Sequence, residues 1–192
     1  MQPNTFKTLV VKTRTVRRFD QAQRVKRADL LDLVILARLS ASGGNLQSLK
    51  FIQSCNPQIN ARIFTCLAWA GYLKTWGGPV EGKRPAAYVV ILGDTTIQRE
   101  IGCDHGIAAQ SIMLGATAKG LGGCIIGSIK RECLRDALAI PVKYEILLVL
   151  ALGRPIEKVI LEIVKAGDIK YWRDAKGRHH VPKRSLREIV LK

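Results

Sequence analysis

The sequence has no apolar run of about 18 residues, the length that a membrane-spanning helix needs. Its first residues, MQPNTFKTLVVKT, have no apolar core followed by a small-residue cleavage site, so no secretory signal is expected. Acidic residues are scarce, 15 against 31 Lys and Arg, and aromatic residues make up only 6%. The 192 residues, 47% of them hydrophobic, are enough to bury one core. We expect a single domain over residues 1–192, cytoplasmic and without a membrane partner.

Signatures of metal binding and hydrolysis are also missing. Only three histidines are present, and two of them, His179 and His180, are adjacent. In an extended segment their side chains point to opposite faces and cannot bind one ion. The sequence contains no GxSxG motif and no CxxC pair among its five cysteines, which we expect to be reduced thiols, most of them in the core. We therefore assign no metal site and no hydrolytic centre.

Two glycine-rich segments come close to nucleotide-binding motifs but fail. GGPVEGKR has the glycine and lysine spacing of a Walker A loop, but Arg84 stands where the motif needs Ser or Thr, and the segment precedes a predicted strand. GLGGCIIG begins like a dinucleotide-binding fingerprint, but Ile125 occupies the place of its third glycine. Neither segment predicts a direct nucleotide-binding fold.

Positive charge is concentrated at both ends of the chain. The formal net charge is +16; residues 1–27 hold eight basic residues and one acid, and residues 165–192 hold nine and three. Such ends can bind nucleic acid, lie on a membrane surface, line an anion site or simply be solvated. Charge alone favours a solvated surface.

Hydrophobic periodicity predicts helices and strands that interleave without a repeat or a linker. The result is an α/β or α+β domain. The helix at 28–39 is apolar almost all round, so we expect it to be buried on most sides. Beyond residue 155 the chain turns polar and extended. We expect helices over 5–12, 28–39, 57–67, 104–119, 131–138 and 185–191, strands over 49–54, 86–93, 123–126 and 144–153, and a long loop over 72–85.

Three polar groups are candidates for anion or ligand binding, although each is weak alone. Two guanidinium groups and a hydroxyl in RTVRRF could converge on a phosphate. Glycines in SASGGNLQ permit close approach of the backbone to a flat ligand. For the first group the alternative is a solvated basic loop, and for the second an ordinary turn. The candidates are Arg14, Thr15 and Arg17; Ser42, Asn45 and Gln47; and Lys183 with Arg184.

Together these segments resemble the FMN-dependent nitroreductase family over nearly the whole chain. The resemblance rests on RTVRRF, ASGGNLQSL, DHGIAAQSIMLGATAKGLGG, ALAIPVKYEILLVLALGRP and the closing PKRSL. It implies an α+β fold with a mixed, mostly antiparallel sheet flanked by helices. It also implies an intertwined homodimer with two FMN sites at the interface. The segment at about 156–192 is too polar to form its own core, so we expect it to reach across to the partner subunit.

The resemblance implies three groups of FMN-binding residues. The phosphate and ribityl end would be held by Arg14, Thr15, Arg17, Lys183 and Arg184. The isoalloxazine ring would lie against residues of the partner subunit, namely Ser42, Gly43, Asn45 and Gln47. A backbone N–H near flavin N5 would come from Ile126 and Gly127. The chain departs from the family pattern at Thr13, Ala41, Ser48 and Leu49, where the family often has Arg, Pro, Pro and Trp.

The implied activity is a ping-pong oxidoreductase reaction in which NAD(P)H gives hydride to flavin N5 and a nitroaromatic, quinone or similar conjugated acceptor takes it. The cofactor carries the chemistry, so no side chain is assigned as catalytic. Two alternatives stay open. One is a basic protein that binds nucleic acid or another polyanion, which the lack of a nucleic-acid-binding motif disfavours. The other is a family member that uses flavin for flavin reduction, dehalogenation or another oxidation.

Overall fold

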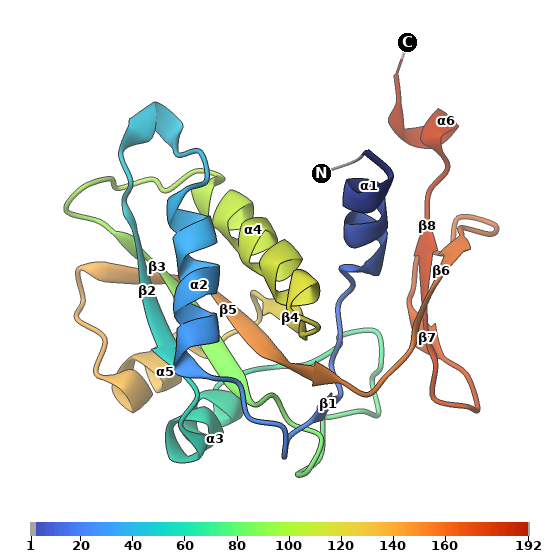
Figure 1. Ribbon diagram of the computed structural model, residues 1–192, viewed down its shortest axis with the longest axis horizontal. Coiled ribbons are helices and arrows are strands. Elements are labelled where there is room, and N and C mark those ends of the chain that lie inside the picture. The colour runs from blue at the N-terminus through green and yellow to red at the C-terminus, as the bar shows by residue number, and fades with distance from the viewer. Residues whose placement is uncertain (1–2, 192) are drawn as a thin grey trace.

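A five-stranded antiparallel sheet forms the centre of the molecule, which is a computed structural model describing residues 3–191 (Figure 1). The strand order is β1-β5-β3-β2, and β4 pairs with β5 outside this path. β5 is the longest strand and pairs with β1, β3 and β4. The strands are β1 (Phe19–Asp20), β2 (Leu49–Ser54), β3 (Ala87–Asp94), β4 (Gly122–Ile126) and β5 (Tyr144–Pro155).

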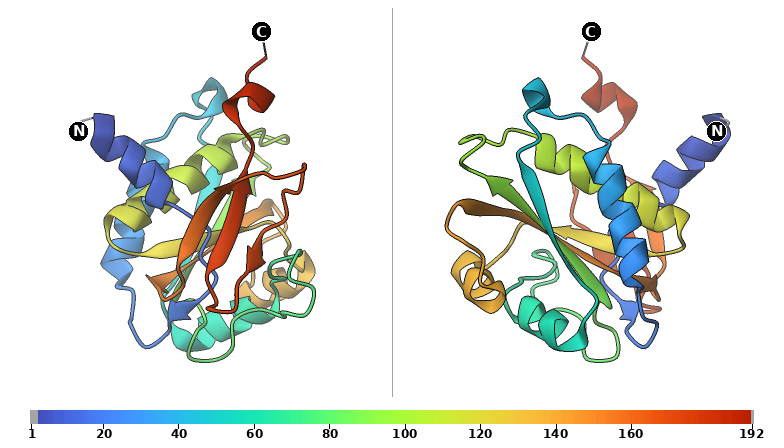
Figure 2. Two further views of the ribbon diagram at one scale, coloured as in Figure 1. Left: turned by 90° about the vertical axis from the view of Figure 1, so that its right-hand side faces the viewer. Right: turned by 60° about the vertical axis from the view of Figure 1, so that its left-hand side comes forward.

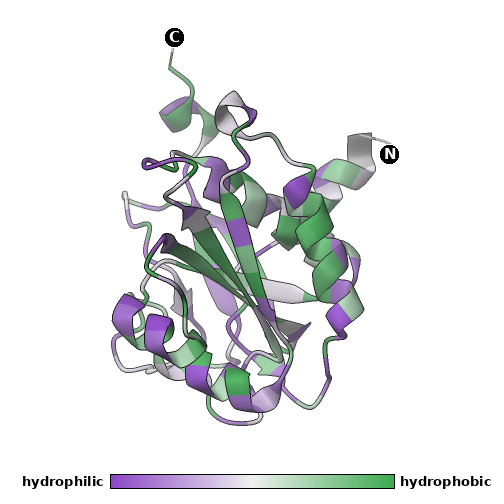
Figure 3. Cartoon of the chain, turned by 90° about the vertical axis from the view of Figure 1, so that its left-hand side faces the viewer, coloured by the Kyte–Doolittle hydropathy of each residue, from purple (hydrophilic) through white to green (hydrophobic). Residues whose placement is uncertain are grey.

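Helices cover both faces of this sheet, because β3 is apolar on both sides. Val89 and Ile91 pack on one face, whereas Tyr88 and Val90 pack on the other, as the period of two in a strand requires. Every residue of this strand is buried, and the strand is largely hydrophobic apart from Asp94 at its end (Figure 3). On the first face lie α2 (Arg27–Arg38) and α4 (Asp104–Ala118), and on the second lie α3 (Pro57–Thr65) and α5 (Arg131–Leu138). The expected α+β fold with a mostly antiparallel, helix-flanked sheet is confirmed.

The contact between α2 and α4 depends on small residues. A side-chain carbon at Gly115 would overlap Leu36 and lie 2.9 Å from Leu33 Cδ2, so any larger residue would require these two leucines to shift. The expectation that α2 is buried on most sides is wrong for the single chain. Leu31 and Leu39 are 54% and 66% exposed, and only three residues of the helix are buried. An apolar face of α2 is therefore available to a partner.

A second, three-stranded sheet lies at one side of the molecule, near α1 (Figures 1 and 2). Its central strand β8 pairs in parallel with β6 and antiparallel with β7. The sequence predicted only an extended chain here, and the helix expected at 185–191 is shorter. The elements are α1 (Pro3–Lys12), β6 (Val159–Ile163), β7 (Trp172–Arg173), β8 (His179–Lys183) and α6 (Leu186–Ile189).

The boundaries of several elements agree with the sequence predictions. The strand at 49–54 and the helix at 131–138 coincide with β2 and α5. Gly120 follows α4 in the left-handed region, with φ +73°, a conformation that favours glycine after a helix. Within residues 3–191, no helix is both long enough and apolar enough to cross a membrane.

The cysteine prediction was wrong for one pair. Cys66, at the end of α3, and Cys133, on α5, form a disulfide across 67 residues of sequence. The two helices pack on the same face of the sheet, which brings the residues together without any CxxC spacing. Cys55, Cys103 and Cys124 are free.

Candidate functional site

Residues from the two ends of the chain meet at one pocket of about 180 Å³ beside α4 and β4. Arg14 follows α1 and Lys183 ends β8, so the pocket joins both basic segments of the sequence. The lining residues are Thr13, Arg14, Thr15, Gln110, Met113, Ile125, Val181 and Lys183. Two cationic side chains, Arg14 and Lys183, line the pocket and no carboxylate of residues 3–191 does, so the pocket favours a negatively charged ligand.

The segment after α1 is fixed against β4. Thr15 forms a parallel bridge with Gly123, and the backbone N–H of Val16 donates to the Gly123 carbonyl at 2.8 Å. A side-chain carbon at Gly123 would lie 2.7 Å from the Ala151 carbonyl oxygen, so β4 needs glycine there. The bridge and the hydrogen bond with Gly123 together hold Arg14 and Thr15 at the pocket.

Arg14 is anchored at the end of α1 through part of its guanidinium. Nε donates to the Thr13 carbonyl at 2.6 Å and Nη2 donates to the Val10 carbonyl at 3.2 Å. The carbonyl end of a helix attracts a cation. A guanidinium has five N–H donors, so Arg14 can hold this position and still donate to an anion.

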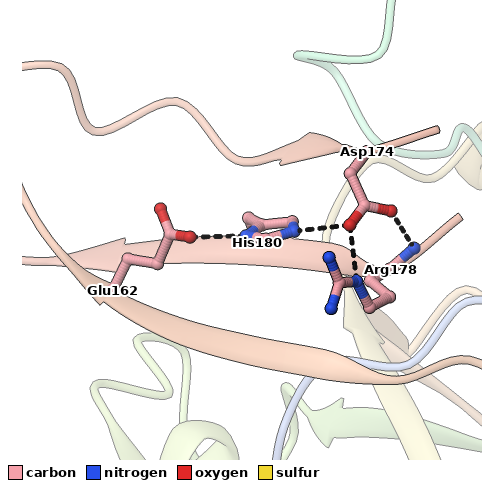
Figure 4. Close-up of polar contacts among 4 residues, drawn as sticks. All are labelled: Glu162, Asp174, Arg178 and His180. Carbon is pink, nitrogen blue, oxygen red and sulfur yellow. Dashed lines mark hydrogen bonds and ion pairs between the residues drawn. The ribbon is translucent and has the colours of Figure 1, made fainter. Parts of the chain in front are cut away.

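Lys183 reaches the pocket because β8 is fixed in the second sheet by His180. His180 Nδ1 lies 2.5 Å from Glu162 Oε1, and Nε2 lies 3.2 Å from Asp174 Oδ2 (Figure 4). The Trp172 ring stacks on the His180 ring at 4.0 Å. The hydrogen bond to Glu162 raises the pKa of His180 above its usual value, which favours an imidazolium between two carboxylates.

Asp174 has the opposite shift. Burial opposes its ionisation, but hydrogen bonds from the Arg178 backbone and side chain outweigh burial, and the pKa of Asp174 lies below its usual range. Asp174 is thus ionised near neutral pH, and its contact with His180 connects β8 with the residue that follows β7.

Arg17 does not line this pocket. Its Nη1 lies 3.2 Å from His179 Nε2, and its guanidinium lies over the Tyr171 ring, 4.8 Å from the centroid. Burial, together with the charge of Arg17, lowers the pKa of His179 to about 4, so this ring is neutral at pH 7 and can accept the hydrogen bond. The two histidines thus have separate partners, as the strand alternation predicted.

Arg184 does not line the pocket either, although its neighbour does. Its Nη1 lies 3.2 Å from Glu188 Oε1 on α6, and its side chain is half exposed. Within β8, Val181 and Lys183 are two residues apart and share one face of the strand, which is the face at the pocket.

The loop predicted to contact the flavin ring lies at the other end of α4. Figures 1 and 2 show the 3-10 turn η1 (Gly43–Asn45) and α1 on opposite sides of α4. Ser42 and Gln47 line a different pocket, of about 140 Å³, between α2, β2 and α4. Within one chain, therefore, this loop and the Arg14 pocket are separate.

A buried carboxylate, Asp104, organises this loop. The Ser42 hydroxyl donates to Asp104 Oδ2 at 2.6 Å, and the Gly43 N–H donates to Oδ1 at 3.0 Å. Asn45 and Gln47 have φ of 55° and 52°, a left-handed conformation that non-glycine residues adopt at a cost. Such a backbone, held by a buried acid, is typical of a loop shaped for a ligand.

Ile126 and Gly127 occupy the end of β4. Ile126 is 4% exposed and packs with the α3–α5 side of the core, whereas Gly127 is exposed. Just beyond, the Ala68 N–H donates to the Ser128 carbonyl at 3.0 Å, which ties the start of the long loop to this strand end. The pocket is lined here by Ile125 instead.

Sequence reasoning missed several residues of these sites, including Thr13 and Val181 at the Arg14 pocket. Gln110, Met113 and Ile125 line the pocket, and Asp104 holds the loop. A signal existed for two of them, because Gln110 and Met113 are three residues apart on one face of α4. The acid in the first turn of α4 was visible too, but its partner Ser42 lies 62 residues away.

The family model for the Nitroreductase family matches residues 10–154. The chain belongs to the nitroreductase family. This match confirms the resemblance to the family, although the closing PKRSL motif lies beyond the matched residues.

Solved structures share this nitroreductase fold at low sequence identity. An FMN-dependent nitroreductase from Clostridium difficile R20291 is 23% identical, with a TM-score of 0.66, over 78% of this chain and 87% of that one. A nitroreductase family protein from Clostridium novyi NT is 22% identical, with a TM-score of 0.66, over 78% and 84%. A nitroreductase-like protein from Streptococcus mutans is 16% identical, also with a TM-score of 0.66, over 90% and 95%.

Proposed function

We propose that this nitroreductase-family protein is an FMN-dependent oxidoreductase that transfers hydride from NAD(P)H to a nitroaromatic, quinone or similar conjugated acceptor. The observation that carries the proposal is the convergence of Arg14, Thr15 and Lys183 at one pocket, although 168 residues separate Thr15 from Lys183. Membership of the family supports a flavin oxidoreductase, and the name of one structural neighbour includes FMN dependence.

The residues of the pocket fit the phosphate end of FMN. A phosphate monoester carries close to two negative charges at pH 7, and Arg14 and Lys183 supply two positive ones. The Thr15 hydroxyl and the Gln110 amide add neutral donors. The 180 Å³ volume suits the phosphate and part of the ribityl chain, so the ring would extend beyond this pocket.

When bound, FMN would supply the hydride chemistry, and the protein residues would bind and orient it. Arg14 and Lys183 would hold the phosphate, and the Gly127 backbone N–H would donate to the edge of the ring. Ser42, Gly43, Asn45 and Gln47 would lie against the ring from the partner subunit. Arg17 and Arg184 would have to turn from their present contacts to reach the phosphate, so we give them a secondary role.

A homodimer is part of this proposal. In one chain the Ser42–Gln47 loop and the Arg14 pocket lie apart, so a partner would have to bring the two together. Exposed leucines, Leu31 on α2 and Leu39 directly after this helix, offer an apolar surface for that contact. In the present structure residues 156–191 contact their own chain, and we propose that this segment also reaches the partner.

The contacts of the basic termini weigh against the alternative of a polyanion-binding protein. Arg17 lies over Tyr171, Arg173 pairs with Glu157 at 3.0 Å, and Arg178 pairs with Asp174. These arginines make contacts with residues of the C-terminal segment, so they do not form free arms.

The supply of NAD(P)H places the proposed reaction in the cytoplasm. There the Cys66–Cys133 disulfide would have to withstand cellular thiol reductants.

The proposal is tested by titrating FMN into the protein and following flavin fluorescence. The R14A and K183A double variant should remain folded and bind FMN at least tenfold more weakly, because two charge-assisted contacts are lost. K176A, which removes an exposed lysine from the turn before β8, is the matched control and should bind FMN normally. Full FMN affinity in the double variant would refute the phosphate assignment.

A further inference from the structure

A larger cavity, of about 400 Å³, lies on the other face of the central sheet. It is bounded by α3, by the turn after β1 and by residues 81–86. Tyr88 and Phe64, which line it, belong to the core on the α3–α5 side, whereas the Arg14 pocket lies beside α4. The cavity is therefore separate from the proposed flavin site, and its volume lies within the range of small-molecule pockets.

Two buried donors at this cavity have no partner among residues 3–191. Tyr88 is 1% exposed, and its hydroxyl makes no hydrogen bond. The Nε of Arg84 is buried and also has no hydrogen-bond partner. Burial raises the pKa of Tyr88, against the effect of Arg84, so the phenol keeps its proton. Buried polar groups are nearly always paired, so two unpaired groups lining one cavity point to a ligand.

Arg84 is held in place by an aromatic ring and not by an acid. Its guanidinium lies over the Phe64 ring, 4.4 Å from the centroid, and its backbone N–H donates to Gln21 Oε1 at 3.2 Å. Within residues 3–191 it forms no ion pair with a carboxylate. Stacking fixes the plane of the guanidinium and leaves its N–H edge for an acceptor.

The remaining wall is partly polar and partly apolar. One exposed base, Arg24, and one exposed acid, Glu81, also line the cavity, so their charges offset and Arg84 leaves it with an excess of positive charge. Asn60 is buried and uses both ends of its amide: Nδ2 donates to the Ala86 carbonyl at 2.8 Å, and Oδ1 accepts from Ser54 at 2.7 Å. It therefore shapes the cavity without competing for the ligand. Pro57, Ala61 and the Phe64 ring provide apolar surface.

We propose that this cavity binds a small organic anion, a carboxylate on a flat apolar body. The Nε–H of Arg84 and the hydroxyl of Tyr88 are both donors, so the ligand must supply an acceptor, and the guanidinium favours a negative one. A carboxylate matches the planar edge of a guanidinium with two parallel hydrogen bonds. The apolar body would pack against Phe64, Pro57 and Ala61. This proposal does not depend on the flavin assignment.

The test is isothermal titration with benzoate up to about 10 mM, at constant ionic strength, and with neutral benzamide as the matched probe. Benzoate should bind, and benzamide should bind at least tenfold more weakly. Tyr88→Phe should weaken benzoate binding roughly threefold to tenfold, and Arg84→Gln tenfold or more. Absence of benzoate binding, or equal affinity for both probes, would overturn the proposal.

Two control variants separate this site from others. Arg99→Gln, at an exposed position, and Arg14→Ala, at the flavin pocket, should both leave benzoate affinity unchanged. Loss of binding in R14A would assign benzoate to the other pocket and overturn the proposal. Tyr88→Phe keeps the ring in the core, so it remains informative if Arg84→Gln does not fold.

A chemical readout locates the ligand independently. Cys55 lines the cavity and is a free thiol, whereas Cys103 is free, exposed and outside the cavity. Saturating benzoate should slow alkylation of Cys55 by iodoacetamide at least threefold, measured by peptide mass spectrometry, and leave Cys103 unchanged. Equal rates at Cys55 with and without benzoate would place the ligand elsewhere.

Discussion

Replacing Asp104 with alanine should destabilise the protein, because the loop at residues 42–47 loses its anchor. The carboxylate accepts hydrogen bonds from the Ser42 hydroxyl at 2.6 Å and the Gly43 N–H at 3.0 Å. Hydrogen bonds to a charged group contribute about 1.5–3 kcal/mol, and the two share one carboxylate, so we expect a loss of about 2–3 kcal/mol. For a chain of this size that corresponds to a melting temperature lower by about 5–10 °C.

Calorimetry on three variants tests this reasoning. D104N should lie between wild type and D104A, because an amide oxygen can still accept from Gly43 but without the charge. The control is Glu132→Ala, which removes an exposed acid from the first turn of α5 and with it only the helix-dipole contribution. A D104A protein that melts within about 1 °C of wild type, or an equal loss in E132A, would refute the anchoring role.

Two further predictions concern the second sheet. K183A should lower FMN affinity about tenfold or more, and R184A less than twofold, because of these two residues only Lys183 lines the pocket. Titration followed by flavin fluorescence measures both affinities. Equal losses in the two variants would contradict the placement of Lys183 at the pocket. The contribution of the two histidines to stability should be greatest near pH 6.5. His180, with its raised pKa, stabilises fully below about 6.5 and loses this effect as pH rises through its folded pKa. His179, with a pKa of about 4, is neutral when folded, so stability falls as pH drops from about 6.5 towards 4. Melting temperatures of wild type, H179F and H180F, measured below and above about pH 6.5, test the two effects separately. If neither variant changes the pH dependence of the melting temperature, the roles given to the two histidines are refuted.

Four of the five strands of the central sheet were predictable because they are largely apolar and bounded by turns, but the two-residue strand β1 was not predicted. β2 and β3 could be placed from composition and length alone, and α4 from its small residues and the glycine that follows. The second sheet was not predicted. β6 is largely apolar, but β7 has only two residues and β8 contains two histidines and a proline, so neither of these two shows a strand pattern. The sheet also depends on contacts of His180 with Glu162 and Asp174, which lie on other segments. Local patterns carry no information on such contacts.

The candidate site was predictable in part. The motifs identified Arg14, Thr15 and Lys183, which the structure brings together. They did not predict that the Arg17 side chain points towards Tyr171 and His179, because this orientation depends on tertiary packing. The preference for Lys183 over Arg184 follows from strand alternation, but only once β8 is known to be a strand.

The visible absorption spectrum of the purified protein, reconstituted with FMN and recorded anaerobically before and after NADH or NADPH, tests the central claim most directly. The account predicts a bound flavin band that bleaches with at least one nicotinamide and returns when a quinone is added. A protein that takes up no FMN, or a bound flavin that neither nicotinamide reduces, would contradict the proposed function.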